Sequence, residues 1–409
     1  MNNYTGRKHN IWWGPPRKFS TSIEERKISW LELFYDLVYV IVISRITHHL
    51  ATNPCTEGIV DYFLLFLMIF WGWINGSMYH DLHGSLGIRT RFMTLWQMMA
   101  VAALAVTMSG PPELFVNRGT IALIFLQFYI TYLWWSVGIY DKNHRKLNRP
   151  YTFCYLIALS LIFITLYVSQ PYKRILFGLA LVFNYLPPFF AAFHFGKRNL
   201  NLNLSPSMAE RLGLFTIIVF GEAILGVING ASDAADLNAH VWEGFGMGIL
   251  IVFALWWIFF SLIADREIKS GFIRGQIMSM LYIPALASLG IIGAIFSMLI
   301  KNIDSFPAAP LFLKELFGVS LFVFLLSIWA ISLHLHYPKE YNASGKIMRL
   351  LIISSGLCIL LITFFFGKLS FLFYMGLIFC IFFVIIVAMT RIWFKLELKR
   401  LDEEELLKK

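Results

Sequence analysis

Two carboxylic acids stand in a stretch of the chain that is otherwise almost entirely apolar. Glu32 and Asp36 lie four residues apart within 29–50, and a third acid, Glu222, lies within a second apolar stretch at 208–229. An ionised acid at the centre of a membrane helix costs about 2.5–3.5 kcal/mol, so such residues usually face a bundle interior or a water-filled cavity. There they pair with another charge or bind a proton. Proton relay or ion transfer is the chemistry indicated, and a buried pair that only fixes packing is the alternative.

The spacing of these acids predicts which helix face each one lies on and how deep it lies in the membrane. Because positions i, i+4 and i+7 share one face of a helix, Glu32, Asp36 and Tyr39 project in the same direction. At 1.5 Å of rise per residue, Asp36 lies about 9 Å inside its apolar helix and Glu222 about 15 Å inside its own, near the middle of a bilayer. We predict that Asp36 and Glu222 form a proton or ion pathway. Glu32 would be its entry group, and Tyr39 would support it.

Three further charged residues are predicted to support the acids. Arg211 shares a helix face with Glu222 but lies about 16 Å away along the axis, which is too far for direct contact. We therefore place Arg211 at the cytoplasmic boundary, where its guanidinium reaches Glu32 or an anionic lipid head group. Snorkelling of this side chain to the interface is the alternative. Glu210 precedes it in the sequence, and Arg45 lies near the outer end of the first apolar helix.

The amino-acid composition predicts what kind of protein contains these charged residues. Hydrophobic residues make up 58% of the 409-residue chain and charged residues 14%, against about a quarter in a typical soluble domain. An all-α, polytopic integral membrane protein is therefore predicted. A spanning helix needs about 20 mostly apolar residues, and twelve segments fit that requirement. They run near 29–50, 58–79, 91–109, 116–140, 150–169, 173–193, 208–229, 241–264, 279–299, 311–333, 346–366 and 370–393.

The distribution of Lys and Arg predicts the orientation. With the N-terminus in the cytoplasm, 27 of these 34 residues fall in the two terminal segments and in every second loop. Cytoplasmic loops carry such an excess, so both termini are predicted to be cytoplasmic. Basic loops beside anionic lipid also account for the net charge of +10, and no nucleic-acid partner is needed.

The two halves of the sequence are similar to each other. Asp36 recurs as Glu222 at an offset of 186 residues, and Trp71 recurs as Trp256 at an offset of 185. Because six is an even number of spans, two six-helix units would have the same orientation and form a parallel repeat. The predicted division is a cytoplasmic N-terminal segment, two membrane units and a cytoplasmic tail, at 1–28, 29–200, 201–395 and 396–409.

Motifs for other chemistries are absent from the sequence. It contains no Walker A loop, no nucleophile elbow, no His-Glu-x-x-His and no dinucleotide fingerprint. His80 and His83 have a spacing that some zinc sites use, but no set of Cys or Glu residues completes it. We therefore expect neither a metal nor a cofactor, and the sequence favours a function other than catalysis.

Two stretches carry a family resemblance, ELFYDLVYV at 32–40 and ERLGLFTIIVFGEAI at 210–224. The first is similar to Glu-Leu-Phe-x-Asp-Leu-Val-x-Val, and the second to Glu-Arg-x-x-x-x-Thr-Ile-x-x-x-Gly-Glu. In these motifs the sequence resembles the bacterial low temperature requirement A (LtrA) family, whose hydrophobic profile fits over 20–395. Tyr35 and Tyr39 are small departures, since Phe is commoner at both positions.

The resemblance implies a multi-pass protein of the bacterial inner membrane, linked by name to growth in the cold. The resemblance identifies no reaction. Glu32, Asp36 and Glu222 are therefore matched to the family only as positions of its motifs. The leading hypothesis is movement of an ion or small solute through a cavity lined by Glu32, Asp36 and Glu222, with proton coupling as one form. The partners would be the lipid bilayer and that solute. A membrane-embedded enzyme acting on lipid and a scaffold without transport are the alternatives. Polar groups that continue from Asp36 to the outer side would favour transport.

Overall fold

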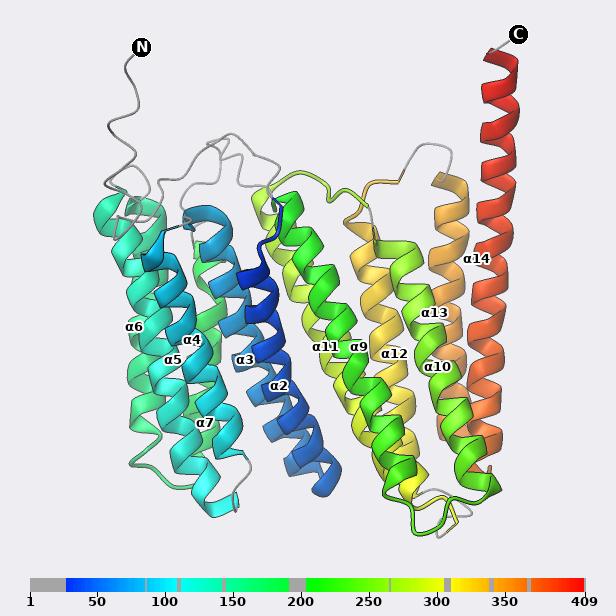
Figure 1. Ribbon diagram of the computed structural model, residues 1–409, viewed down its shortest axis with the longest axis horizontal. Helices are drawn as coiled ribbons and strands as arrows, with labels where there is room; N and C mark the ends of the chain where they lie inside the picture. Colours follow the sequence, from blue (N-terminus) through cyan, green and yellow to red (C-terminus); the bar gives the residue numbers. More distant parts are fainter. Residues whose placement is uncertain are drawn as a thin grey trace. The chain divides into compact units, whose positions relative to one another are not determined.

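A computed structural model gives the fold of the protein (Figure 1). It describes residues 27–84, 87–108, 112–141, 145–190, 204–264, 266–304, 310–337, 342–365 and 369–407. In these residues the chain forms twelve α-helices and no named strand, apart from an isolated β-bridge between Ile268 and Leu335. The prediction of an all-helical protein is confirmed.

The helices form two compact units, and each is described by itself. Unit 1 contains the described residues up to Phe215 and the short segment Ser270–Gln276. Unit 2 contains Thr216–Lys269 and the described residues from Ile277 onwards. The division falls inside two helices, so the first turns of each belong to unit 1 and the remainder to unit 2. The predicted six-helix units and their parallel repeat stay predictions.

Unit 1 is built around α3. Its helices are α2 (Trp30–Thr52), α3 (Thr56–His83), α4 (Ile88–Thr107), α5 (Pro112–Tyr140), α6 (Arg145–Ile164), α7 (Tyr172–Tyr185) and the first turns of α9 (Pro206–Ser232) and α11 (Phe272–Lys301). α3 packs against α2, α5 and α7 (Figure 1). We call the end of unit 1 at which α2 begins and α3 ends its inner end, and the opposite end its outer end.

A glycine allows side chains to reach the backbone of α3. A Cβ atom on Gly76 would lie 2.1 Å from the hydroxyl oxygen of Tyr35 and 2.6 Å from Nε2 of Gln97. No larger residue fits in that space, because real Cβ atoms do not approach other atoms so closely. α2 and α4 can therefore place polar side chains directly against the middle of α3, and the candidate site depends on this approach.

Unit 2 contains the rest of α9 and α11, with α10 (Ala239–Ile263), α12 (Leu311–Leu333), α13 (Asn342–Phe365) and α14 (Phe371–Leu407). The backbones of α9 and α11 approach each other closely, and a Cβ on Gly226 would come within 2.1 Å of the carbonyl oxygen of Gly293. Small residues permit such backbone-to-backbone packing inside membranes, where dispersion contacts replace the hydrophobic driving force. Unit 2 is accordingly packed through apolar and small residues in this region.

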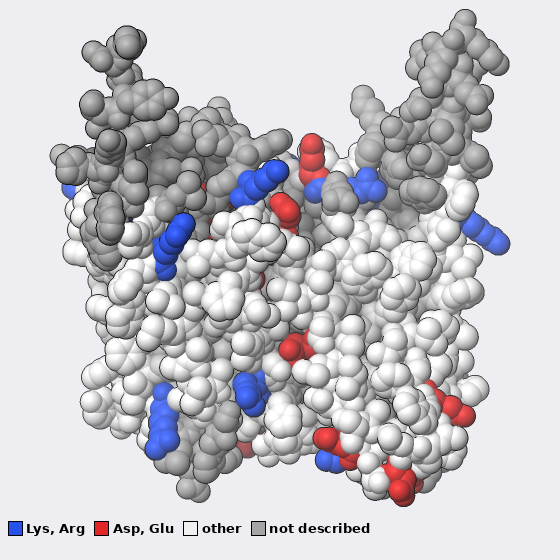
Figure 2. Space-filling model, in the orientation of Figure 1, with Lys and Arg blue, Asp and Glu red and all other residues white. Residues whose placement is uncertain are grey.

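Eight of the described helices are long and apolar enough to cross a membrane, namely α3, α5, α9, α10, α11, α12, α13 and α14. On the face drawn in Figure 2, charged side chains lie mainly toward the helix ends and leave the middle largely uncharged. The prediction of twelve spans is not confirmed. α7 has only 14 residues, because Pro187 lies just beyond its end at Tyr185 and cannot continue the helix. α2, α4 and α6 carry charged residues that lower their mean hydropathy.

Two predicted segments fall largely or partly outside the described residues. The N-terminal segment 1–28 is described only at its last two residues. The C-terminal tail, 396–409, begins inside α14, which continues without a break to Leu407.

We predict that α2, α4, α6 and α7 also cross the membrane, because the Lys and Arg residues then gather in the cytoplasmic loops. A reporter that is active only outside the cytoplasm should be active when it is inserted at 53–55 and silent when it is inserted at 84–87. A fusion after Leu407 is the control. It should be silent whether the chain crosses the membrane eight or twelve times, because both numbers are even and leave the C-terminus in the cytoplasm. A silent reporter at 53–55 would mean that α2 does not cross.

Candidate functional site

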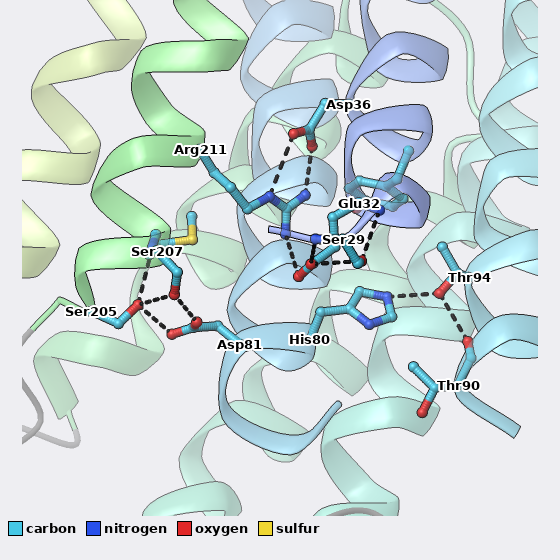
Figure 3. A network of polar contacts seen from close by, with 12 residues as sticks. Ser29, Glu32, Asp36, His80, Asp81, Thr90, Thr94, Ser205, Ser207 and Arg211 are labelled. Atoms are coloured by element: carbon cyan, nitrogen blue, oxygen red, sulfur yellow. Dashed lines mark hydrogen bonds and ion pairs between the residues drawn. The ribbon is translucent and has the colours of Figure 1, made fainter. Parts of the chain in front are cut away.

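A buried cluster of three charged residues lies in the inner half of unit 1. Nη2 of Arg211 donates to Oδ1 of Asp36 at 2.5 Å, and Nε of the same guanidinium donates to Oδ2 at 3.4 Å. Nη1 of Arg211 lies 3.7 Å from Oε1 of Glu32 (Figure 3). Asp36 is 0% exposed, Arg211 1% and Glu32 4%. We call Glu32, Asp36 and Arg211 the charge cluster.

The start of α2 positions the two carboxylates of the cluster. Ser29 caps the helix and forms a capping box with Glu32, whose Oε2 accepts from the backbone nitrogen of Ser29 at 2.9 Å and from its hydroxyl at 2.8 Å. This arrangement satisfies backbone donors at the helix start and fixes the direction of the Glu32 carboxylate. Asp36 follows one turn later, so both acids face Arg211 from the same side of α2.

Aromatic rings surround the cluster and exclude water from it. Nε1 of Trp73 donates to Oδ1 of Asp36 at 2.7 Å, and its indole stacks on Phe215 with ring centroids 4.2 Å apart. The guanidinium of Arg211 lies over the rings of Tyr35 and Trp73, at 5.6 and 5.9 Å from their centroids. The carboxylate of Asp36 therefore accepts hydrogen bonds from both Arg211 and Trp73.

The first turns of α9 carry Arg211 to this position. The carboxylate of Asp81, near the end of α3, accepts from the hydroxyls of Ser205 and Ser207, each at 2.6 Å. Arg211 follows one turn after Ser207 and points toward α2 (Figure 3). Two sets of polar contacts, at Asp81 and at Asp36, thus join the beginning of α9 to unit 1.

A neutral polar layer lies next to the cluster. Nε2 of Gln97, on α4, donates to the hydroxyls of Tyr35 and Tyr39, both at 2.7 Å. The hydroxyl of Tyr35 donates in turn to the backbone carbonyl of Gly72 at 3.2 Å. Oε1 of Gln97 is buried and has no hydrogen-bond partner. This layer extends the buried polar groups one turn deeper than Asp36 along α2.

The opposite face of α3 carries a second buried network. The hydroxyl of Tyr155, on α6, donates to Oδ1 of Asn75 at 2.6 Å. Gln127 and Asn184 exchange two amide hydrogen bonds of 2.9 Å between α5 and α7. Nε1 of Trp71 donates to the backbone carbonyl of Asn184 at 2.9 Å, which ties this pair to α3.

A cavity of about 200 Å³ lies near the outer end of unit 1, between α3, α5 and α7. Asp61 lines it and receives two hydrogen bonds from the guanidinium of Arg174, at 2.8 and 2.9 Å. His49, Thr120 and Lys173 also line the cavity. Its lining also includes apolar residues such as Leu123 and Phe177.

The structure brings together three of the predicted site residues and adds a fourth nearby. Glu32, Asp36 and Arg211 form the charge cluster, and Tyr39 belongs to the adjacent layer. Glu210 is exposed on α9. Arg45 is exposed nine residues beyond Asp36, roughly 14 Å along the helix axis. Glu222 lies in unit 2, where it is half-buried.

The predicted environment of Arg211 needs a correction. Sequence analysis placed its guanidinium at the membrane boundary, in reach of Glu32 or a lipid head group. The contact with Glu32 is present at 3.7 Å. The side chain is buried and not at a lipid boundary, however, with 1% of its surface exposed, and its main partner is Asp36. The physical reason is that a buried carboxylate requires a counter-charge, and α9 begins close enough to α2 to supply one.

Sequence reasoning also missed Gln97, Tyr155 and Asn184. Each is a polar residue whose immediate neighbours in the sequence are mostly apolar, and nothing in its local sequence identifies its partner. The signal that was present is energetic. An amide inside a membrane helix is expensive unless it is hydrogen-bonded, so each such residue predicts a buried partner without naming it.

The cluster geometry predicts a strong thermodynamic coupling. Asp36→Ala should lower the free energy of unfolding by about 3–5 kcal/mol, because it leaves a buried guanidinium without its main partner. The double variant Asp36→Leu with Arg211→Met should lose less than the sum of the single losses, since apolar side chains can replace a buried pair at little cost. Unfolding in detergent measures both values. Arg45→Met, on the same helix but exposed, is the control, and additive losses at Asp36 and Arg211 would contradict the coupling.

Comparison with known proteins shows the family of the chain. Residues 27–391 match the description "Bacterial low temperature requirement A protein (LtrA)". The chain is also 26% identical over 252 residues to "Uncharacterized protein RA0937" of Rhizobium meliloti (strain 1021), in a match that covers 58% of this chain and 59% of that relative. The matched part thus spans less than two thirds of the relative's length. No solved structure matches the chain. The protein belongs to the bacterial low temperature requirement A family.

Proposed function

We propose that the protein moves an ion or a small solute across the membrane through the interior of unit 1, and that protonation of the charge cluster is coupled to this movement. The observation that supports the proposal is a run of polar groups along α3, in which Trp71, Trp73 and Asn75 are buried and the partly exposed Asp61 and Asp81 stand at the two ends. Asp61 and Asp81 are 20 residues apart on this helix, about 30 Å along its axis, which equals the thickness of the hydrocarbon core. Polar and ionisable groups at such depths usually belong to a transport pathway.

The inner half of the proposed pathway begins at the charge cluster. In the predicted orientation the inner end faces the cytoplasm of a bacterial cell, so Glu32 is the first acid of the charge cluster that a proton from that side reaches. Asp36 lies one turn further in, and the hydroxyl of Tyr39 lies near the end of the next turn. Gln97 offers a buried acceptor in this layer, at Oε1, to which a water molecule or a cationic solute can donate.

The outer half contains the amide pair of Gln127 and Asn184 and then the cavity that Asp61 and Arg174 line. We place an apolar layer between these two features. Leu123, in the lining of the cavity, is buried and precedes Gln127 by four residues, about 6 Å of helix. This layer would close the pathway on the outer side and open during a transport cycle.

The position of Arg211 gives a physical basis for coupling. Its guanidinium lies beside two carboxylates on one helix face, with Asp36 nearer than Glu32. A proton that binds Asp36 removes the stronger of these attractions and leaves Glu32 as the nearby anion. Arg211 would then shift toward the inner end, and the start of α9 would shift with it. Glu222, in unit 2, stays a candidate for a second acid in the cycle.

Transport in reconstituted vesicles tests the proposal. Wild-type protein should move a substrate from a panel of ions and small solutes when a pH gradient is applied. Asp36→Asn should reduce the flux about tenfold or more, equivalent to at least 1.4 kcal/mol on the barrier, and should flatten its pH dependence. Gln97→Met changes no charge, so it should lower the flux and leave the pH profile unchanged.

Glu243→Gln is the matched control, because Glu243 is an exposed acid on α10 in unit 2 that takes no part in the charge cluster. It should transport as the wild type does. Equal flux and equal pH dependence for Asp36→Asn would show that the cluster is structural. A wild type that moves nothing across a broad panel would contradict transport, and activity on lipid would then be the function to test.

A further inference from the structure

Unit 2 contains a cavity of about 380 Å³. It lies at the end of this unit where α10 and α12 finish and α13 begins, and Figure 1 shows these helix ends. Its lining combines two arginines, Arg266 and Arg349, with hydroxyl groups such as those of Tyr337 and Ser344. The rest of the wall is largely apolar. None of the lining residues in the described part of the chain is an acid. The cavity therefore has a cationic, hydrogen-bonding end and an apolar side.

Backbone contacts hold the cationic end in place. The segment after α10 is paired with the segment after α12: the nitrogen of Lys269 donates to the carbonyl of His334 at 2.9 Å, and the nitrogen of His336 donates to the carbonyl of Glu267 at 2.8 Å. The hydroxyl of Tyr337 donates to the carbonyl of Leu262 at 3.0 Å. The polar end of the cavity is thus formed by a fixed pair of segments and not by isolated surface side chains.

The guanidinium of Arg266 lies over the ring of Tyr337, 5.6 Å from the centroid, and Arg349 lines the same cavity. Burial raises the pKa of Tyr337 above its ordinary value, and Arg266 and Arg349 act in the opposite direction because their positive charges favour the phenolate. Two cations in the lining of one cavity form a site suited to an anion with several acceptor oxygens, such as a phosphate.

The apolar side of the cavity runs into the membrane-spanning helices. Trp257 lies six residues before the end of α10, about 9 Å further into the membrane, and is 38% exposed. Ile352 and Met389 complete this wall from α13 and α14. A small soluble anion would use only the cationic end. An acyl chain attached to the anion would also cover the apolar wall.

We propose that this cavity binds an anionic phospholipid, with the phosphate between Arg266 and Arg349 and the beginning of one acyl chain against Trp257. Basic pockets between membrane helices near the cytoplasmic surface are suited to such head groups. The volume accommodates a head group and the first part of a chain, and the remaining chain length stays in the bilayer. In the predicted orientation the site faces the cytoplasmic leaflet.

Binding to the purified full-length protein tests the assignment, with nanodiscs of phosphatidylglycerol and of phosphatidylcholine as the two lipid probes. The wild type should retain phosphatidylglycerol and be stabilised by it, while phosphatidylcholine and inorganic phosphate should have little effect. Arg349→Gln should weaken phosphatidylglycerol binding about tenfold, since one charge-assisted contact to the phosphate is lost. Trp257→Ala should weaken it without changing the charge of the cavity.

Arg391→Gln is the matched control, because it removes the same charge from an exposed position on α14. It should bind phosphatidylglycerol as the wild type does. An unchanged unfolding temperature in phosphatidylcholine verifies that each variant is folded. Equal binding by Arg349→Gln and the wild type would overturn the site. Full competition by inorganic phosphate, together with no effect of Trp257→Ala, would show a soluble-anion site and overturn the lipid assignment.

Discussion

Arg211 lies inside unit 1 beside Asp36, and neither charge is stable in that position without the other. Each is almost completely removed from solvent, and their separation of 2.5 Å offsets a desolvation cost of several kcal/mol per ion. Much of the surrounding structure serves this pair. Trp73 donates to the carboxylate, aromatic rings cover the guanidinium, and Asp81 holds the first turn of α9 through two serines. The first turns of α9 thereby belong to unit 1, while the rest of this helix belongs to unit 2.

The helices of the two units are packed through different kinds of residue. In unit 1, polar side chains from α2, α4, α5, α6 and α7 meet on two faces of α3, and glycines on that helix let them approach its backbone. In unit 2, α9 and α11 approach each other through Gly226 and Gly293 and exclude side chains from the contact. A glycine contact of this kind favours rigid packing. Hydrogen-bonded amides and hydroxyls can exchange partners, which suits a pathway. The proposed transport route therefore lies in unit 1, and unit 2 carries the proposed lipid site at its edge.

Several features of the site could be predicted because they depend on local geometry. Glu32, Asp36 and Tyr39 share one face of α2, as their spacing requires, and the acids were identified from their cost in an apolar helix. The partner of Arg211 could not be chosen in the same way. It lies 175 positions from Asp36 in the sequence, and the contact depends on how α9 begins against α2. Glu32 also completes the capping box of Ser29, and the spacing Ser-x-x-Glu at 29–32 is the local signature of that cap.

The sequence by itself determined that the protein is helical, that its helices are largely apolar and that it belongs to the low temperature requirement A family. These properties depend on local composition and on two short motifs, so they can be predicted without knowing any contact between helices. Only the tertiary structure decided which buried polar groups meet. Arg211 joined Asp36, the amide of Asn184 joined that of Gln127, and Glu222 became part of a different unit from Asp36. The reason is that a buried polar group must find a partner, but its identity is set by the packing of helices that are distant in the sequence.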